Sequence, residues 1–174
     1  MNEYWNRCCL IVFTGVRAGI SPCLRTDDKI LQKLGTLLPS DSIRLHMAHY
    51  SNDTNVEEWP KINADAGQAN GIFMEEQFRK AFAQGYRKVT GLFSCPEELG
   101  RKHLEEAFLS LRPLDFCLGP DPAGGIYLLG MSTMEASVLN PQPWGQEQLA
   151  RSITRQIGGM KKIMYKLAVA GHKG

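Results

Sequence analysis

A turn rich in glycine and proline, within residues 118–130 (LGPDPAGGIYLLG), carries the residues of this chain best placed for chemistry. The adjacent Gly124 and Gly125 allow a sharp turn and a close approach of the backbone to a ligand, because neither has a Cβ. Turns of this kind often form the floor of a nucleotide or sugar pocket. Asp121 offers a carboxylate, but Ala123 stands where catalysis on a phosphate would need one. The turn therefore predicts a ligand pocket with reduced catalytic chemistry.

Two further loops carry polar residues directly after predicted buried strands. The loop at 15–26 contains two arginines, Arg17 and Arg25, and the loop at 94–99 contains Glu97. One hypothesis is that Asp121 and Glu97 form a displaced metal site, with the two arginines binding phosphate. The alternative is that all four charges are solvated. This alternative is favoured, because charged residues in loops are usually exposed.

The cysteines and histidines form no recognisable metal or redox motif. No cysteine pair has the C-x-x-C spacing, and the histidines do not match H-E-x-x-H. We expect reduced cysteines in or near the core, as in a reducing cytoplasm. Cys95 follows a buried strand and could act as a nucleophile, although a packing role is favoured because no histidine marks it as activated. The cysteines are Cys8, Cys9, Cys23, Cys95 and Cys117.

Two aromatic residues near the turn could stack on a base or a sugar. Tyr127 lies within an apolar run and is expected in the core of a strand. For Trp144, stacking on a ligand and packing in the core both stay open, because turn tryptophans near a pocket are often half exposed.

Length and composition fit one globular domain, which we expect to span residues 1–174. The net charge of +2, from 20 basic and 18 acidic residues, gives no reason to expect binding to nucleic acid or to a membrane surface. The amino-terminal residues do not resemble a signal peptide, and no apolar run is long enough to cross a bilayer. The expected location is therefore cytoplasmic.

Apolar runs and amphipathic periodicity alternate along the chain, which predicts a three-layer α/β/α sandwich with a mainly parallel sheet. Ligands of such folds bind outside the carboxyl ends of the strands. The helix at 68–84 is expected to bury Ile72, Met74, Phe78, Ala81 and Phe82. The expected strands are 9–14, 43–50, 89–93, 115–118 and 126–131. The expected helices are 27–38, 68–84, 99–111, 132–139, 145–157 and 160–169, and residues 51–67 are expected to form a loop.

The order of these loops resembles a family of bacterial transferase-like proteins with the nucleotide-diphospho-sugar transferase fold, also called GT-A. The resemblance covers residues 9–157 and leaves 158–174 as a divergent carboxyl-terminal segment. Its clearest parts are the helix at 75–85, the dipeptide Cys95-Pro96, the turn at 118–130 and Pro143-Trp144. The resemblance implies a nucleotide or nucleotide-sugar ligand and a glycosyltransferase-like or nucleotidyltransferase-like protein.

The chain departs from the family pattern mainly at polar positions. Ser94 stands where the family has an aspartate expected to hold a divalent metal, and Ala123 replaces the aspartate before the paired glycines. The basic positions of the first loop fall near Pro22 and Leu24. Metal-dependent transfer relies on such carboxylates and cations, so we expect the family's route of catalysis to be lost, with binding less affected.

Two functions therefore remain open from the sequence. The first is a protein that binds a nucleotide or nucleotide-sugar, with residual or altered activity; Mg²⁺ or Mn²⁺ would be a cofactor only if a displaced acidic site exists. The second is a catalytically inactive relative that acts as a protein-interaction or scaffolding module, as a homodimer for example. No catalytic residue is assigned. The expected pocket residues are Thr14, Gly15, Arg17, Gly19, Arg25, Ser94, Cys95, Asp121, Gly124, Gly125 and Trp144.

Overall fold

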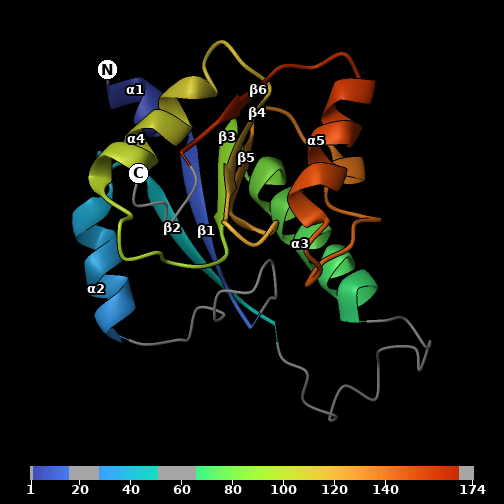
Figure 1. Cartoon of the computed structure of the whole chain (residues 1–174). Coiled ribbons are helices and arrows are strands. Elements are labelled where there is room, and N and C mark those ends of the chain that lie inside the picture. Colours follow the sequence, from blue (N-terminus) through green and yellow to red (C-terminus); the bar gives the residue numbers. More distant parts are fainter. Residues whose placement is uncertain (1, 16–27, 51–65, 169–174) are drawn as a thin grey trace.

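The computed structural model describes residues 2–15, 28–50 and 66–168, and these residues form a six-stranded sheet with helices on both faces (Figure 1). The strand order is β2-β1-β3-β5-β4-β6. The strands are β1 (Cys8–Thr14), β2 (Arg44–His49), β3 (Lys88–Leu92), β4 (Phe116–Pro120), β5 (Ile126–Met131) and β6 (Met164–Lys166). The helices are α1 (Asn2–Trp5), α2 (Asp28–Leu37), α3 (Ala66–Ala83), α4 (Arg101–Ser110) and α5 (Leu149–Gly159), with a 3₁₀ turn, η1, at Ala136–Val138.

Five strands run in one direction and β5 runs against them. β1 pairs in parallel with β2 and β3, and β4 pairs in parallel with β6, whereas β5 is antiparallel to both β3 and β4. The carboxyl ends of β1, β2, β3 and β4 therefore lie at one edge of the sheet, and the turn that joins β4 to β5 lies at the same edge. We call this the carboxyl edge.

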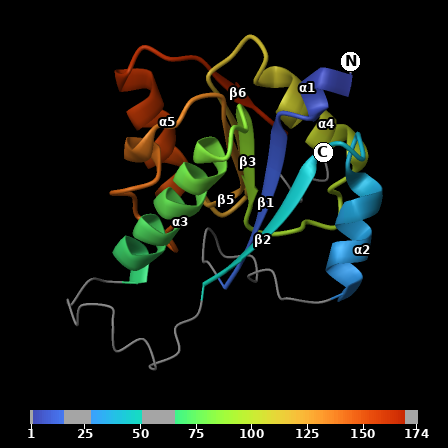
Figure 2. The same cartoon turned by 180° about the vertical axis from the view of Figure 1, so that it is seen from behind.

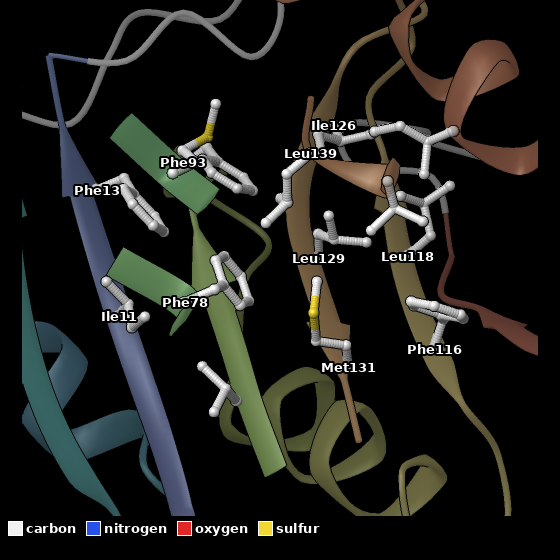
Figure 3. Close-up of a cluster of buried hydrophobic side chains, with 14 of the residues drawn as sticks. Ile11, Phe13, Phe78, Phe93, Phe116, Leu118, Ile126, Leu129, Met131 and Leu139 are labelled. Carbon is white, nitrogen blue, oxygen red and sulfur yellow. The ribbon is translucent and has the colours of Figure 1, made fainter. Parts of the chain in front are cut away.

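Side chains of β1 alternate between the two faces of the sheet, as expected of a strand buried on both sides. Ile11 and Phe13 belong to the core under α3 and α5, whereas Leu10 and Val12 belong to the core under α1, α2 and α4. Figure 3 shows Ile11 and Phe13 on the same side of the sheet as Leu129 of β5. These two cores confirm the three-layer α/β/α sandwich with a mainly parallel sheet.

All five predicted strands are confirmed, with small shifts of their ends. The prediction of a helix at 160–169 is wrong, because residues 164–166 form the edge strand β6. The Asp115 carboxylate accepts a hydrogen bond from the Ile163 N–H (3.0 Å), and the Leu167 N–H donates to the Leu118 carbonyl (2.8 Å). These bonds, made by the residues directly before and after β6, hold the segment extended along β4.

The remaining corrections concern helices. Helix α3 begins at Ala66, inside the predicted loop, and residues 51–65 lie outside the described part of the chain. Ile72 is exposed rather than buried, because it lies about 200° around the helix from Met74 at 100° per residue. The predicted helix at 132–139 is reduced to η1, and α5 starts at Leu149, four residues later than predicted.

No helix in the described ranges is both long and apolar enough to span a membrane.

Candidate functional site

The topology brings two of the three predicted loops together at the carboxyl edge. Ser94 and Cys95 follow β3, and Asp121, Gly124 and Gly125 form the turn between β4 and β5. Helices α2 and α3 also begin at this edge, where β1 and β2 end (Figures 1 and 2). Arg17, Gly19 and Arg25 lie outside the described residues.

Asp121 is buried in the turn, with 6% of its surface exposed, so the favoured expectation of a solvated loop charge is wrong for this residue. Its Oδ1 accepts hydrogen bonds from the backbone N–H groups of Ala123 (2.8 Å) and Gly125 (2.9 Å). These bonds replace water at one carboxylate oxygen and stabilise the turn. An aspartate shortly before a glycine turn is a sequence signal for this arrangement.

Three polar side chains near the carboxyl edge have a buried oxygen that no described residue satisfies. They are Asp121 Oδ2, Ser94 Oγ and Asn70 Oδ1, from the β4–β5 turn, the residue after β3 and the first turns of α3. Leaving such a group without a partner costs about 1–3 kcal/mol, so unsatisfied oxygens in a native fold require a reason. Asn70 was not among the predicted pocket residues, and an isolated asparagine in a helix gives no signal in the sequence.

The glycines of this edge are required by contacts within the chain. Gly124 has φ +94°, and a Cβ there would lie 1.9 Å from the carbonyl oxygen of Glu147. Gly15 has φ +79°, and its Cβ would lie 2.2 Å from the carbonyl oxygen of Tyr50. A close approach of the backbone to a ligand was predicted for Gly124 and Gly125, but the structure places Gly124 against the backbone of Glu147.

Two other predicted pocket residues use their polar groups internally. The Thr14 hydroxyl is buried and lies 2.7 Å from Nδ1 of His49. Trp144 is 3% exposed, so of the two alternatives for its ring the structure favours packing in the core. Its indole N–H donates to the Leu139 carbonyl (2.7 Å), and its ring lies 5.5 Å from that of Phe93. Trp144 therefore packs against Phe93, the residue directly before Ser94.

The described cysteines have the character of packing residues. Burial raises the pKa of the Cys95 thiol, and the nearby Lys33 ammonium opposes this shift. Burial also raises the pKa of Cys9 to about 11, and those of Cys8 and Cys117 to about 12. These thiols are protonated at neutral pH, which argues against a thiolate nucleophile. Cys23 lies outside the described residues.

The residues present do not fit the divalent metal that the fold family implies. Ser94 and Ala123 replace the two family aspartates, and one oxygen of Asp121 is already bonded to backbone N–H groups. Within residues 2–15, 28–50 and 66–168, no group of three or more histidine, cysteine, aspartate or glutamate side chains could hold a metal ion. Glu97, the proposed partner of Asp121, is exposed whereas Asp121 is buried.

A depression lies at the opposite edge of the sheet, where α1 meets the end of α4. Its lining includes Tyr4, Trp5 and Arg112, and the Arg112 guanidinium lies 5.0 Å from the centre of the Tyr4 ring. It contains none of the predicted pocket residues.

Comparisons with known proteins agree with this architecture. Residues 44–146 match the model of a family described as an uncharacterized protein conserved in bacteria, DUF2064, and the chain belongs to this family. No curated protein is a significant match. Among solved structures, the chain is similar to a protein from Desulfovibrio desulfuricans G20 described as a "putative nucleotide-diphospho-sugar transferase". The TM-score is 0.67 at 21% identity, over 92% of this chain and 79% of the other. The chain thus has a nucleotide-diphospho-sugar transferase-like fold.

Proposed function

We propose that this protein binds a nucleotide or nucleotide-sugar at the carboxyl edge of its sheet and does so without the family's metal-dependent transfer chemistry. The observation that carries the proposal is the pair of unsatisfied buried oxygens, Ser94 Oγ and Asp121 Oδ2, in two neighbouring loops of that edge. Buried polar groups in native folds have partners, and a bound ligand would supply them.

The positions of the helices support an anionic ligand at this edge. Helix α3 has 18 residues, begins at the carboxyl edge and has no acidic residue in its first turn. The amino end of such a helix carries unpaired N–H groups and a partial positive charge, both of which favour a phosphate. The similar solved structure is described as a "putative nucleotide-diphospho-sugar transferase", and this description supports the same ligand class for the proposal.

Thermal unfolding in the presence of UDP-, GDP-, CDP- and ADP-sugars, with and without Mn²⁺ or Mg²⁺, tests this function. A ligand at about 100 times its dissociation constant stabilises the native state by roughly 2.7 kcal/mol. We expect one nucleotide class to raise the melting temperature equally with and without the metal. A shift that requires the metal would contradict the proposal and support a metal-dependent transferase. The absence of a shift with every nucleotide-sugar would contradict nucleotide binding.

The exposed edge strand favours a scaffolding module as the second candidate. Strand β6 is paired on one side among the described residues. Tyr165 in this strand (37%) and Ile163 directly before it (61%) are exposed apolar side chains. Such an edge can accept a strand of another chain. Light scattering after size-exclusion chromatography tests this candidate: a dimer that the substitution Ile163→Asp dissociates would support it, and a monomer at high concentration would argue against self-association.

A further inference from the structure

Strand β6 is the last strand of the sheet, and its backbone groups on the side away from β4 are available to another chain (Figure 1). The Ile163 carbonyl accepts a hydrogen bond from β4 (3.2 Å), and the Leu167 N–H donates one to β4 (2.8 Å). Backbone groups of successive strand residues point to alternate sides, so those of Met164 and Lys166 point away from β4. Within residues 2–15, 28–50 and 66–168, no strand pairs with this outer side and no loop backbone bonds to these two residues.

The side chains at β6 differ between the two faces of the sheet. Tyr165 lies beside Cys117 of β4, on the face covered by α1, α2 and α4, and the exposed Ile163 is two residues earlier on the same face. Met164 packs against the core under α3 and α5, and the exposed Lys166 extends from that face. A strand added at this edge would therefore have apolar neighbours on one face and a cation on the other.

The charge of this part of the chain is uniformly positive. Residues 148–168 contain five basic residues and no acidic one, in a protein whose net charge is +2. Three of the five, Lys161, Lys162 and Lys166, lie in β6 or directly before it. Both ion pairs of the described ranges lie within α3, so these lysines have no carboxylate partner there. The Asp115 carboxylate, which lies beside this segment, is bonded to a backbone N–H. The β6 edge therefore favours a negatively charged partner.

A second copy of this chain is a poor occupant of the edge. Pairing of β6 with another β6 would bring two sets of three lysines together, and like charges on neighbouring strands destabilise a sheet. Lysines at a sheet edge are a common protection against such pairing. A strand that carries carboxylates converts the same charges into attraction. The edge thus opposes self-association and suits an acidic segment.

We propose that the outer side of β6 binds an extended acidic segment of another protein as an additional strand of the sheet. Met164 and Lys166 supply the backbone hydrogen bonds. Apolar side chains of the segment cover Ile163 and Tyr165, and its carboxylates lie beside the lysines. This inference rests on the second candidate function, for which it names the partner, and it is independent of nucleotide binding at the carboxyl edge.

The probe is a short peptide of alternating valine and glutamate residues with blocked ends, measured by isothermal titration calorimetry. Two control peptides separate charge from strand pairing. In the first, lysine replaces every glutamate, which reverses the charge and keeps the backbone. In the second, every backbone N–H is N-methylated, which keeps the charge and prevents pairing. We expect binding of the glutamate peptide alone.

The matched variants are Lys166→Pro and Lys166→Gln. Both remove the charge, but only proline also removes the outward N–H, which no bond of the sheet uses. We expect Lys166→Pro to weaken binding of the glutamate peptide at least about tenfold, the scale of a lost hydrogen bond together with a lost ion pair. Lys166→Gln should weaken it about two- to fivefold. Lys102→Gln, at an exposed position in the first turn of α4, is the charge control and should leave the affinity unchanged. Circular dichroism and thermal unfolding establish that each variant is folded.

The outcomes separate this inference from both candidate functions. Equal binding of either control peptide, equal affinity of the two Lys166 variants, or no binding at millimolar peptide overturns it; the N-methylated peptide decides alone if Lys166→Pro does not fold. A dimer that Ile163→Asp dissociates also overturns it, because a second copy then occupies the edge, and leaves the scaffolding function standing. Binding of the glutamate peptide that depends on Lys166, in a protein that binds no nucleotide, supports the inference and overturns nucleotide binding alone.

Discussion

The turn between β4 and β5 is fixed by its contact with the start of α5, and the substitution Gly124→Ala should break that contact. Gly124 has φ +94°, a region that costs a residue with a side chain about 1–2 kcal/mol. The new Cβ would lie 1.9 Å from the Glu147 carbonyl oxygen, so one backbone segment must move. That movement endangers the hydrogen bond from the Ala150 N–H to the Gly124 carbonyl (2.9 Å), worth about 0.5–1.5 kcal/mol. Together these contributions predict a loss of about 1.5–3.5 kcal/mol.

Urea denaturation and thermal unfolding measure this loss, which should lower the melting temperature by about 5–15 °C for a chain of this length. The control is Gly158→Ala within α5, where a Cβ would meet nothing within 4 Å. Alanine in a helix is more stable than glycine by about 0.5–1 kcal/mol, so this variant should gain stability. A loss below about 0.5 kcal/mol for Gly124→Ala would refute the role assigned to this contact.

Three further predictions concern buried groups. Trp144→Phe should lower the free energy of unfolding by about 1–3 kcal/mol in urea denaturation, because it leaves the buried Leu139 carbonyl without the indole donor; an unchanged midpoint would contradict this. The Cys117 thiol has its pKa raised from 9.0 to about 12, so its contribution to stability is complete below pH 9 and declines as the pH rises from about 9 to 12. Between pH 8 and 10 the free energy of unfolding should fall by about 1.4 kcal/mol on this account, and by less in Cys117→Ala; equal pH dependence would contradict the assignment. Cys8, Cys9 and Cys117 should react with a thiol reagent at pH 7.5 only after unfolding, as peptide mapping can measure, and rapid labelling of the native protein would contradict their burial.

The parts of the fold that the sequence predicts are those with strong local signals. The continuous apolar run at 9–14 can only be satisfied by burial on both faces, and it forms the central strand β1. The helix at 68–84 is confirmed for most of its length, and its stripe of Met74, Phe78 and Ala81 packs on the sheet as expected.

The segments that were mispredicted depend on distant contacts. Residues 160–169 contain lysines at spacings that suit a helix face, but the hydrogen bonds of Asp115 and Leu118 hold 164–166 as a strand. Helix α1 has four residues and too few side chains to give a periodic pattern.

For the predicted pocket residues, the sequence indicates the position in the fold better than it indicates the surroundings of each side chain. Chain topology alone places the loops after β3 and β4 at one edge, so Ser94 and Asp121 could be expected to be neighbours. The burial of Asp121, its bonds to the turn and the contact of Gly124 with Glu147 arise from the packing of α5 against that turn. No pattern within the turn itself specifies that packing.

Hydrogen–deuterium exchange of the native protein, with and without the nucleotide or nucleotide-sugar that stabilises it most, tests the central claim most directly. The account predicts slower exchange of backbone amides at 93–98 and 121–126, on both sides of the start of β5. Protection confined to the depression at Tyr4 and Arg112, or an exchange pattern unchanged by every nucleotide, would contradict a ligand site at the carboxyl edge.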